Sequence, residues 1–313
     1  MRAAIINKYG KPDVLSIEDI DIPQPLKDQI LIKVNVAGLN PLDYKMRDGS
    51  LKFMTTKRFP KILGGEVAGE VVDNSQTKGE FAIGDRVFAM LDYKGGAYGE
   101  YVAVNENWVA HIPEHIDFVN AAAVPLAGLT AFQALTEKGN IRKGMKILIN
   151  GASGGVGHYA VQIAKAYECK VTAFCSASNI EMVKNLGADK VIDYNQTAVS
   201  DYKEKFHVIF DTVGIIPYRK INKMLETYGC FISTYPSPGL VFRQSLNGFL
   251  FKRAWIIMTH PSGSDLEVLG NMMKQNQLIP HIEKVYPLNE IQEAHKHLET
   301  HRVKGKLVVL IDD

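Results

Sequence analysis

The sequence predicts an α/β protein with a β-rich domain and a doubly wound domain built on a parallel sheet. Three observations support this prediction: strand-like runs punctuated by proline and glycine before about residue 120, alternating strand and helix patterns after it, and a glycine-rich turn at 151–157. A chain of 313 residues is also long enough for roughly two domains.

The first part of the chain has the pattern of short strands. Apolar and polar residues alternate over 29–38, and apolar runs follow at 66–72, 84–90 and 100–104. Prolines and paired glycines separate these runs, as in all-β units with short connections.

The second part alternates between strands and helices. Apolar residues recur with helical period from Val156 to Tyr167, directly after the glycine turn. A second helix is expected around 180–186, and a third over 221–228 with Gly229 as its C-cap. Strands are predicted at 146–150, 171–175, 190–194, 208–213 and 230–235. This alternation indicates a parallel sheet with right-handed crossovers.

Composition and charge exclude several classes of function. The net charge of +2 leaves no electrostatic footprint for nucleic acid or an anionic membrane. The first residues turn polar too early for a secretory signal, and the most apolar later stretches are interrupted before they could span a bilayer. Cys169, Cys175 and Cys230 lack C-x-x-C spacing, which favours a reducing compartment and a cytoplasmic location.

The turn at 151–157 has the features of a dinucleotide-binding turn. Ala152, Gly154 and Gly157 stand at the three positions of G-x-G-x-x-G, and Ser153, Gly155 and Val156 fill the turn between them. Such a turn lets the backbone approach a pyrophosphate and points the free N–H groups of the helix at it. The alternative is a tight turn that serves only close packing of helix on sheet.

The end of the next strand bears on the choice of coenzyme. An NAD site usually places an acidic residue there to bind the ribose 2′-hydroxyl, whereas this chain has Ser176 and Ser178 and no acid before Glu181. Two hydroxyl donors favour NADPH over NADH, because no carboxylate repels a 2′-phosphate. Alternatively, the serines cap the following helix.

The motifs together resemble the medium-chain dehydrogenase/reductase superfamily, in its zinc-independent quinone oxidoreductase branch. The resemblance covers essentially the whole chain and rests on the stretches 9–15, 36–49, 59–72, 84–90, 95–101, 125–135, 150–157, 186–194 and 305–310. It implies a GroES-like catalytic domain over 1–120, completed by 266–313, and a Rossmann cofactor domain over 121–265.

The resemblance also implies individual site residues. Thr130, Val213 and Gly214 match positions that line the nicotinamide and diphosphate, and Tyr194 matches a contact of the 2′-phosphate. The alternative for these positions is packing. Relatives often carry a lysine or arginine just after Ser176, so its absence here weakens the expected phosphate clamp.

The same comparison implies that no metal is bound. Zinc alcohol dehydrogenases of the superfamily have a cysteine where this chain has Asn40 and a histidine where it has Gly65, beside the retained Glu66. All three cysteines lie in the cofactor half, so the first domain cannot supply a thiolate site.

Chemistry without a metal favours quinones and α,β-unsaturated carbonyls, since hydride can add to a conjugated carbon while hydrogen-bond donors stabilise the oxygen. The resemblance places Asn40, Tyr44 and Lys45 beside the nicotinamide, and Tyr44 or Lys45 is the expected oxyanion donor. Alternatively, Asn40 shapes a turn before Pro41, and Lys45 is simply solvated.

Other functions and an assembly remain open from the sequence. An enoyl-thioester reductase of the same fold and a non-catalytic NADPH-binding protein are the alternatives. A short-chain dehydrogenase is disfavoured, because no tyrosine has a lysine four residues later. The apolar stretch 240–258 exceeds what an edge strand should expose, which predicts a homodimer.

Overall fold

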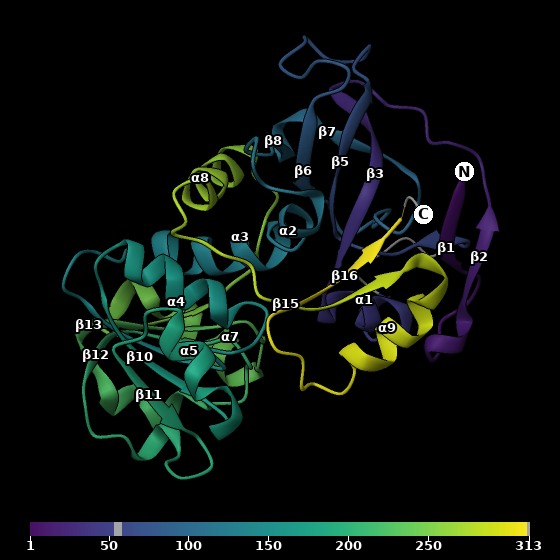
Figure 1. The fold of residues 1–313 in the computed structure, drawn as a ribbon. Helices are drawn as coiled ribbons and strands as arrows, with labels where there is room; N and C mark the ends of the chain where they lie inside the picture. The colour runs from purple at the N-terminus through teal and green to yellow at the C-terminus, as the bar shows by residue number, and fades with distance from the viewer. Residues whose placement is uncertain (53–57, 312–313) are drawn as a thin grey trace. The chain divides into compact units, whose positions relative to one another are not determined.

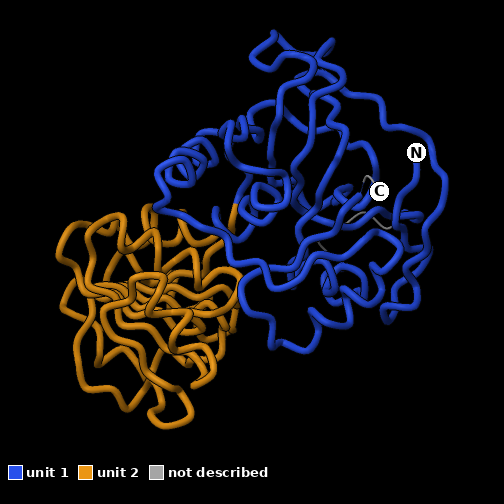
Figure 2. Tube along the Cα trace, viewed as in Figure 1, with its two compact units in different colours: residues 1–129, 260–313 blue, residues 130–259 orange. Residues whose placement is uncertain are grey.

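The computed structural model describes residues 1–52 and 58–311, and the chain divides into two compact units (Figures 1 and 2). Unit 1 comprises residues 1–129 and 260–313, and unit 2 comprises residues 130–259. The domain boundaries expected from the sequence, at 120 and 265, remain a prediction. Within the described ranges, no helix is both long and apolar enough to cross a bilayer.

Unit 1 is the β-rich, GroES-like unit. Its larger sheet has the order β15-β16-β3-β5-β6-β8 with β7 also paired to β3, and a smaller sheet has the order β2-β1-β4. Among the described strands of this unit, β15 and β16 pair in parallel and all other pairs are antiparallel. The strands are β1 (Arg2–Ile6), β2 (Leu15–Asp19), β3 (Gln29–Leu39), β4 (Lys61–Ile62), β5 (Glu66–Asp73), β6 (Arg86–Met90), β7 (Tyr101–Asn105), β8 (Val109–His111), β15 (Ile282–Pro287) and β16 (Lys306–Leu310).

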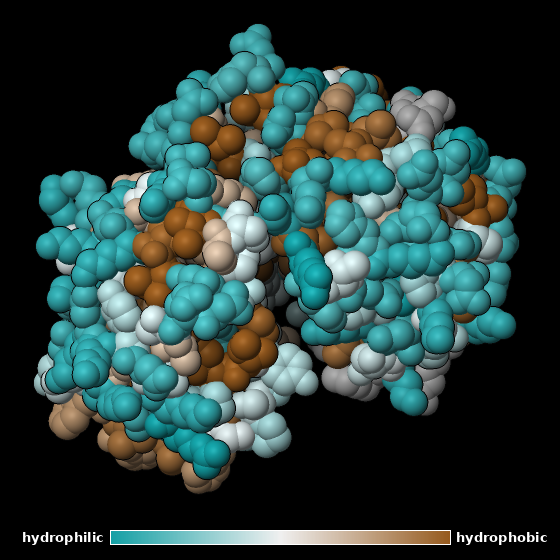
Figure 3. Space-filling view, turned by 60° about the horizontal axis from the view of Figure 1, so that its bottom comes forward, coloured by the Kyte–Doolittle hydropathy of each residue, from teal (hydrophilic) through white to brown (hydrophobic). Residues whose placement is uncertain are grey.

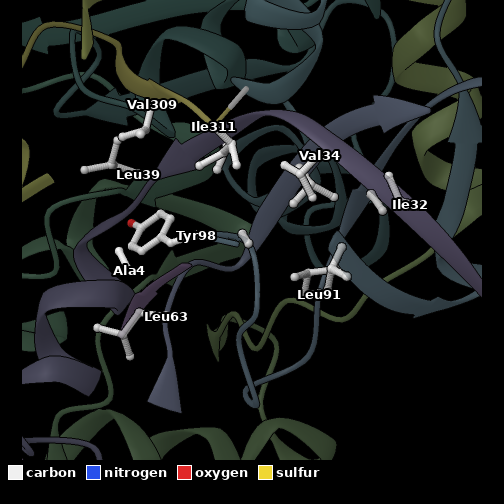
Figure 4. Packing of buried hydrophobic residues seen from close by; sticks show 14 of the residues in the cluster. Ala4, Ile32, Val34, Leu39, Leu63, Leu91, Tyr98, Val309 and Ile311 are labelled. Atoms are coloured by element: carbon white, nitrogen blue, oxygen red, sulfur yellow. The ribbon is translucent and has the colours of Figure 1, made fainter. Parts of the chain in front are cut away.

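The core of unit 1 joins segments that are far apart in sequence. Aliphatic side chains from β1, β3 and β16 surround the fully buried ring of Tyr98, as Figure 4 shows with Ala4 and Leu39 beside it. The helices of this unit are α1 (Pro41–Arg47), α2 (Phe118–Ala122), α8 (Gly263–Lys274) and α9 (Ile291–Leu298). Burial of these apolar groups is the main favourable term in folding of the unit.

Unit 2 is the doubly wound unit. Its sheet is parallel throughout and has the order β11-β10-β9-β12-β13-β14, which is 3-2-1-4-5-6 when the strands are numbered within the unit. The strands are β9 (Lys146–Asn150), β10 (Lys170–Cys175), β11 (Lys190–Asp193), β12 (Phe206–Asp211), β13 (Leu225–Ser233) and β14 (Arg253–Ile256). The helices are α4 (Gly157–Ala166), α5 (Ile180–Asn185), α6 (Tyr218–Ile221) and α7 (Pro238–Ser245), and α3 (Pro125–Gln133) enters the unit from residue 130. This order reverses direction between β9 and β12, where open α/β sheets bind ligands.

The helix predicted over 221–228 is wrong. Helix α6 ends at Ile221, a short 3-10 turn follows, and β13 begins at Leu225. Leu225 pairs with Phe206 of β12, and the register then shifts so that Val208 pairs with Cys230. A Cβ at Gly229 would lie 3.0 Å from the carbonyl oxygen of Phe206, so this glycine serves close strand approach and not a helix C-cap.

The far edge of the unit 2 sheet exposes large apolar side chains. Strand β14 is the edge strand, and in the described part of the chain it pairs only with β13. Exposed apolar residues cluster in sequence around it: Tyr228, Val241, Phe242, Phe249, Leu250, Phe251 and Met258. Figure 3 shows hydrophobic groups gathered in several places on one face of the molecule, among mostly hydrophilic ones.

Candidate active site

The glycine turn connects β9 to α4 at the point where the strand order reverses. The amides of Gly151 and Ala152 each donate to the carbonyl of Phe174 at 3.0 Å, which holds the start of the turn against β10. A Cβ at Gly157 would lie 2.1 Å from the carbonyl oxygen of Gly151, whereas a Cβ at Gly154 would lie 3.4 Å from that oxygen. Gly157 therefore serves helix packing, and Gly154 leaves the backbone open to a ligand.

The predicted coenzyme residues of this sheet lie at one of its edges. Parallel registers align Asn150 with Phe174 and Asp211, and Cys175 with Asp193, so these strands end together. The residues that follow the four strand ends are the turn 151–156, Ser176, Ser178, Tyr194, Val213 and Gly214. The sheet thus gathers these predicted residues at its carboxyl edge, whereas Thr130 lies on α3.

The turn after β10 is tied to the glycine turn by a residue that the sequence did not single out. Asn179 is buried, and its Nδ2 donates to Ser153 Oγ at 2.9 Å. The hydroxyls of Ser176 and Ser178 lie 3.1 Å apart. Ser176 is the N-cap of a 3-10 turn at 177–179, but its side chain makes no capping hydrogen bond. The hydroxyl of Ser176 is therefore not used by the cap. Tyr194, which follows the end of the neighbouring strand β11, has an exposed side chain.

Asp211, also unforeseen, organises the turn after β12. Its fully buried carboxylate accepts hydrogen bonds from the amides of Val213 at 3.2 Å, Gly214 at 3.1 Å and Ile216 at 2.8 Å. The Nδ2 of Asn150 donates to the same carboxylate at 2.8 Å. One carboxylate thus fixes the turn that carries two predicted coenzyme contacts. The signal in the sequence was an aspartate at the end of an otherwise apolar strand.

Thr130 begins unit 2 and is almost fully buried. Its hydroxyl lies 2.7 Å from the hydroxyl of Thr259, at the other end of the unit, and either oxygen can be the donor. This pair joins the two points at which the chain enters and leaves unit 2.

In unit 1, Asn40 takes part in a buried ionic network. Its Nδ2 donates to Glu66 Oε1 at 2.6 Å, and its Oδ1 accepts from Lys306 Nζ at 2.7 Å. Lys306 Nζ also donates to Glu66 Oε1 at 2.6 Å and to the carbonyl of Leu39 at 3.0 Å. The other carboxylate oxygen, Glu66 Oε2, accepts from the amide of Leu126 at 2.6 Å. Asn40 and Lys306 are 2% exposed and Glu66 is 0% exposed, so the network is almost fully buried.

Sequence reasoning missed Lys306. Strand β16 pairs antiparallel with β3, and Leu307 is aligned with Leu39, so Lys306 arrives directly opposite Asn40. The only local signal is a lysine at the start of an apolar terminal strand. A charged residue there is rarely buried without a partner.

Asp43 occupies a second buried polar position. Its Oδ2 accepts from the amide of Asn40 at 2.8 Å and from the hydroxyl of Tyr98 at 2.9 Å, so Asn40 and Asp43 form a capping box at the start of α1. Burial raises the pKa of Asp43 to about 7, against the lowering effect of these hydrogen bonds. The pKa of Tyr98 is raised well above its ordinary value, again chiefly by burial.

The other two predicted donors, Tyr44 and Lys45, lie on helix α1. The ring of Tyr44 packs edge-on against His301, with centroids 5.9 Å apart, and its pKa is raised by burial and by the charges of Glu299 and Asp48. Lys45 is half-buried on the same helix. Among the three candidates, Asn40 hydrogen-bonds to Glu66 and to Lys306.

The chain matches two family models. Residues 26–114 match the alcohol dehydrogenase GroES-like domain, and residues 186–309 match the zinc-binding dehydrogenase family. The two matches together take in most of the chain and agree with the two kinds of sheet described above.

Relatives match over nearly the full length. The chain is 34% identical to a chloroplastic quinone-oxidoreductase homolog of Spinacia oleracea, over 96% of this chain and 95% of that protein. It is 33% identical to a chloroplastic NADPH-dependent alkenal/one oxidoreductase of Arabidopsis thaliana, over 99% of this chain and 79% of that protein. The solved quinone oxidoreductase of Coxiella burnetii superposes with a TM-score of 0.91 at 32% identity, covering 100% of this chain and 99% of that one.

Proposed function

The chain belongs to the medium-chain dehydrogenase/reductase family, in its quinone oxidoreductase branch, and we propose that it is an NADPH-dependent, zinc-independent reductase of quinones and α,β-unsaturated carbonyls. The observation that carries the proposal is the open glycine turn at the reversal point of the parallel sheet. Full-length relatives named for quinone and alkenal reduction support the choice of acceptor.

We assign coenzyme binding to the carboxyl edge of the unit 2 sheet. The turn around Gly154 and the N-terminus of α4 offer backbone N–H groups to a diphosphate. Ser176, Ser178 and Tyr194 offer hydroxyl groups to a 2′-phosphate, which favours NADPH over NADH. Thr130, Val213 and Gly214 are proposed to contact the nicotinamide half. When bound, the nicotinamide supplies the hydride that the acceptor receives.

We propose that catalysis uses no metal, although residues 186–309 match a family described as zinc-binding dehydrogenase. Zinc sites are built from thiolates, imidazoles and carboxylates, and this chain offers Asn40 and Gly65 beside Glu66. The ammonium of Lys306 already lies 2.6 Å from Glu66 and 2.7 Å from Asn40. A divalent cation among these oxygens would meet that positive charge at close range, so the residues present do not fit zinc.

The acceptor oxygen then has to be stabilised by hydrogen-bond donors of the chain. We propose Asn40 as a donor from its fixed amide, with Tyr44 and Lys45 as further donors from α1. Removing one preorganised donor of this kind lowers kcat on the order of 100- to 1000-fold. Weakly activated carbonyls would remain poor substrates, because no Lewis acid polarises them.

The proposed activity is tested by following oxidation of NADPH and of NADH, each with a quinone and with an unsaturated ketone, with and without a chelator. We expect faster turnover with NADPH and no effect of the chelator. Coenzyme binding without turnover on either acceptor would instead identify a non-catalytic binding protein. Zinc recovered in stoichiometric amount would overturn the metal-free assignment.

We also propose that the protein is a homodimer in solution. The support is the edge position of β14 and the exposed aromatic residues on the segments beside it, Phe242, Phe249 and Phe251 among them. Pairing of two such edges would satisfy backbone groups and cover the apolar side chains. Sedimentation at micromolar concentration should give a dimer, and a monomer at that concentration would refute the proposal.

We place the protein in the cytoplasm. The support is its three buried cysteine thiols, none of which forms a disulfide in the described chain. The two relatives compared above carry chloroplastic names, so imaging of a tagged copy in its native cell is the direct test.

A further inference from the structure

We propose that Lys306 and Glu66 act together as positioning residues that fix the amide of Asn40 with its nitrogen available as a donor. This inference rests on the proposed function, in which Asn40 stabilises the acceptor oxygen. It concerns unit 1 alone, because all three side chains belong to that unit.

The charges of the network allow only one orientation of the Asn40 amide. Lys306 Nζ has donors only, so it must face the amide oxygen, which lies 2.7 Å away. The Glu66 carboxylate has acceptors only, so it must face the amide nitrogen, which lies 2.6 Å away. Turning the amide over would set NH₂ against the ammonium and oxygen against the carboxylate, both without water to screen them.

In this orientation one N–H group of Asn40 is not used within the network. Lys306 uses its three N–H donors on Leu39, Asn40 and Glu66. Asn40 Nδ2 carries two hydrogens and gives one of them to Glu66. The second hydrogen makes no hydrogen bond to another described residue, so this orientation leaves one N–H of Asn40 for the acceptor oxygen of the proposed function. The ion pair thus specifies which atom of Asn40 is offered, although it does not itself touch the substrate.

The double variant Glu66→Gln/Lys306→Met removes this specification while keeping the volume. A glutamine at 66 has one oxygen and one NH₂ group. If the oxygen accepts from the Leu126 amide, the NH₂ group faces Asn40, and without the Lys306 charge the Asn40 amide is free to turn over. Replacing a buried ion pair by neutral groups of similar size is often tolerated in stability. We expect kcat to fall about tenfold with both acceptor classes. The fall is smaller than for complete removal of a donor, because Asn40 remains and still adopts the productive orientation part of the time. KM for NADPH should be unchanged.

A double-mutant cycle separates positioning from mere structure. Lys306→Met is made in the wild type and in an Asn40→Ala background, and kcat is measured in all four proteins. If Lys306 acts through Asn40, its replacement lowers kcat in the wild type and has no further effect once Asn40 is alanine. Arg86→Met is the matched control, since Arg86 donates to the carbonyls of Glu114 and Ile116 in the same unit without contacting the network. It should lower the melting temperature and leave kcat unchanged.

The outcomes are distinct for the two proposals. Independent, additive losses in the cycle, or wild-type kcat in the Glu66→Gln/Lys306→Met protein, would overturn the positioning role. Absence of turnover in the wild-type protein with either acceptor would instead overturn the proposed function. The wild type is therefore assayed alongside the variants under the same conditions.

Discussion

The ammonium of Lys306 lies 2.6 Å from a carboxylate oxygen of Glu66, and at most 2% of either side chain is exposed. Both charges have lost their hydration, and they are compensated by each other, by Asn40, and by the backbone at Leu39 and Leu126. Such pairs are costly to break, because removing one partner leaves the other charged and buried.

The first prediction concerns stability. Lys306→Met alone should lower the free energy of unfolding by about 3–5 kcal/mol, since Glu66 is left as an unpaired buried carboxylate. Glu66→Gln/Lys306→Met should recover most of this loss, because no charge remains. Chemical denaturation of both variants and the wild type measures the difference. A single variant as stable as the wild type would contradict the burial of this pair.

The two glycines of the dinucleotide turn should respond differently to a methyl group. Gly157→Ala should destabilise unit 2, because the added Cβ would lie 2.1 Å from a backbone oxygen. Gly154→Ala should keep a melting temperature near that of the wild type, since its Cβ makes an ordinary contact, but should weaken NADPH binding by obstructing the approach to the backbone. Thermal melts and calorimetric titration separate the two effects. Equal behaviour of the variants would rule out this division of roles.

Asp211 should matter for coenzyme binding without touching the coenzyme. Asp211→Asn replaces one carboxylate oxygen by an NH₂ group, which cannot accept a hydrogen bond from the backbone amides that face it. The turn at 213–216 should therefore lose its conformation. We expect the dissociation constant of NADPH to rise about tenfold, for a loss of about 1.4 kcal/mol. Asp201→Asn, on an exposed turn of the same unit, is the control and should bind normally.

The pH dependence of stability should reveal two opposing buried groups. The folded pKa of Asp43 is about 7 against 3.8 unfolded, so its contribution to stability falls as pH rises from about 4 to 7. The folded pKa of His295 is lowered to about 3 from 6.5 by burial and by Arg47, so its contribution is lost as pH falls through the same range. In the wild type the two slopes should largely cancel.

Asp43→Asn should leave His295 as the group that determines the pH dependence of the unfolding free energy in this range. Without a titrating group at 43, the unfolding free energy should fall on acidification from pH 6.5 to 4, by at most about 1.4 kcal/mol per pH unit. At pH 8 the variant should be at least as stable as the wild type, because no charge is buried there. Urea unfolding across this pH range is the measurement. If the stability of the wild type and of the variant changed with pH in the same way, the two groups would not have opposite effects.

The elements found correctly from the sequence are those whose signals are local. The strand before the glycine turn, the periodic helix after it and the residues at the strand ends follow from patterns within about 15 residues. The helix over 221–228 was wrong because pairing of Leu225 with Phe206 overrides a helical apolar spacing.

Site residues set by distant pairing were beyond the reach of sequence patterns. Lys306 meets Asn40 only because β16 aligns with β3, and Asp211 meets Asn150 only because β12 lies beside β9. Neither alignment follows from the composition or spacing of the residues involved. Asn40 was predicted as a site residue from the family resemblance, but its contact with Lys306 could not be predicted, because nothing local in the sequence connects the two.

The pairing of β16 with β3 also sets an order of events during biosynthesis. Lys306 leaves the ribosome 266 residues after Asn40, and the whole of unit 2 is made in between. Until the last strand docks, Glu66 has no counter-charge and the edge of β3 is open to other partners. We therefore expect the β-rich half of the nascent chain to complete its fold later than the inserted half, whose strands are all available earlier.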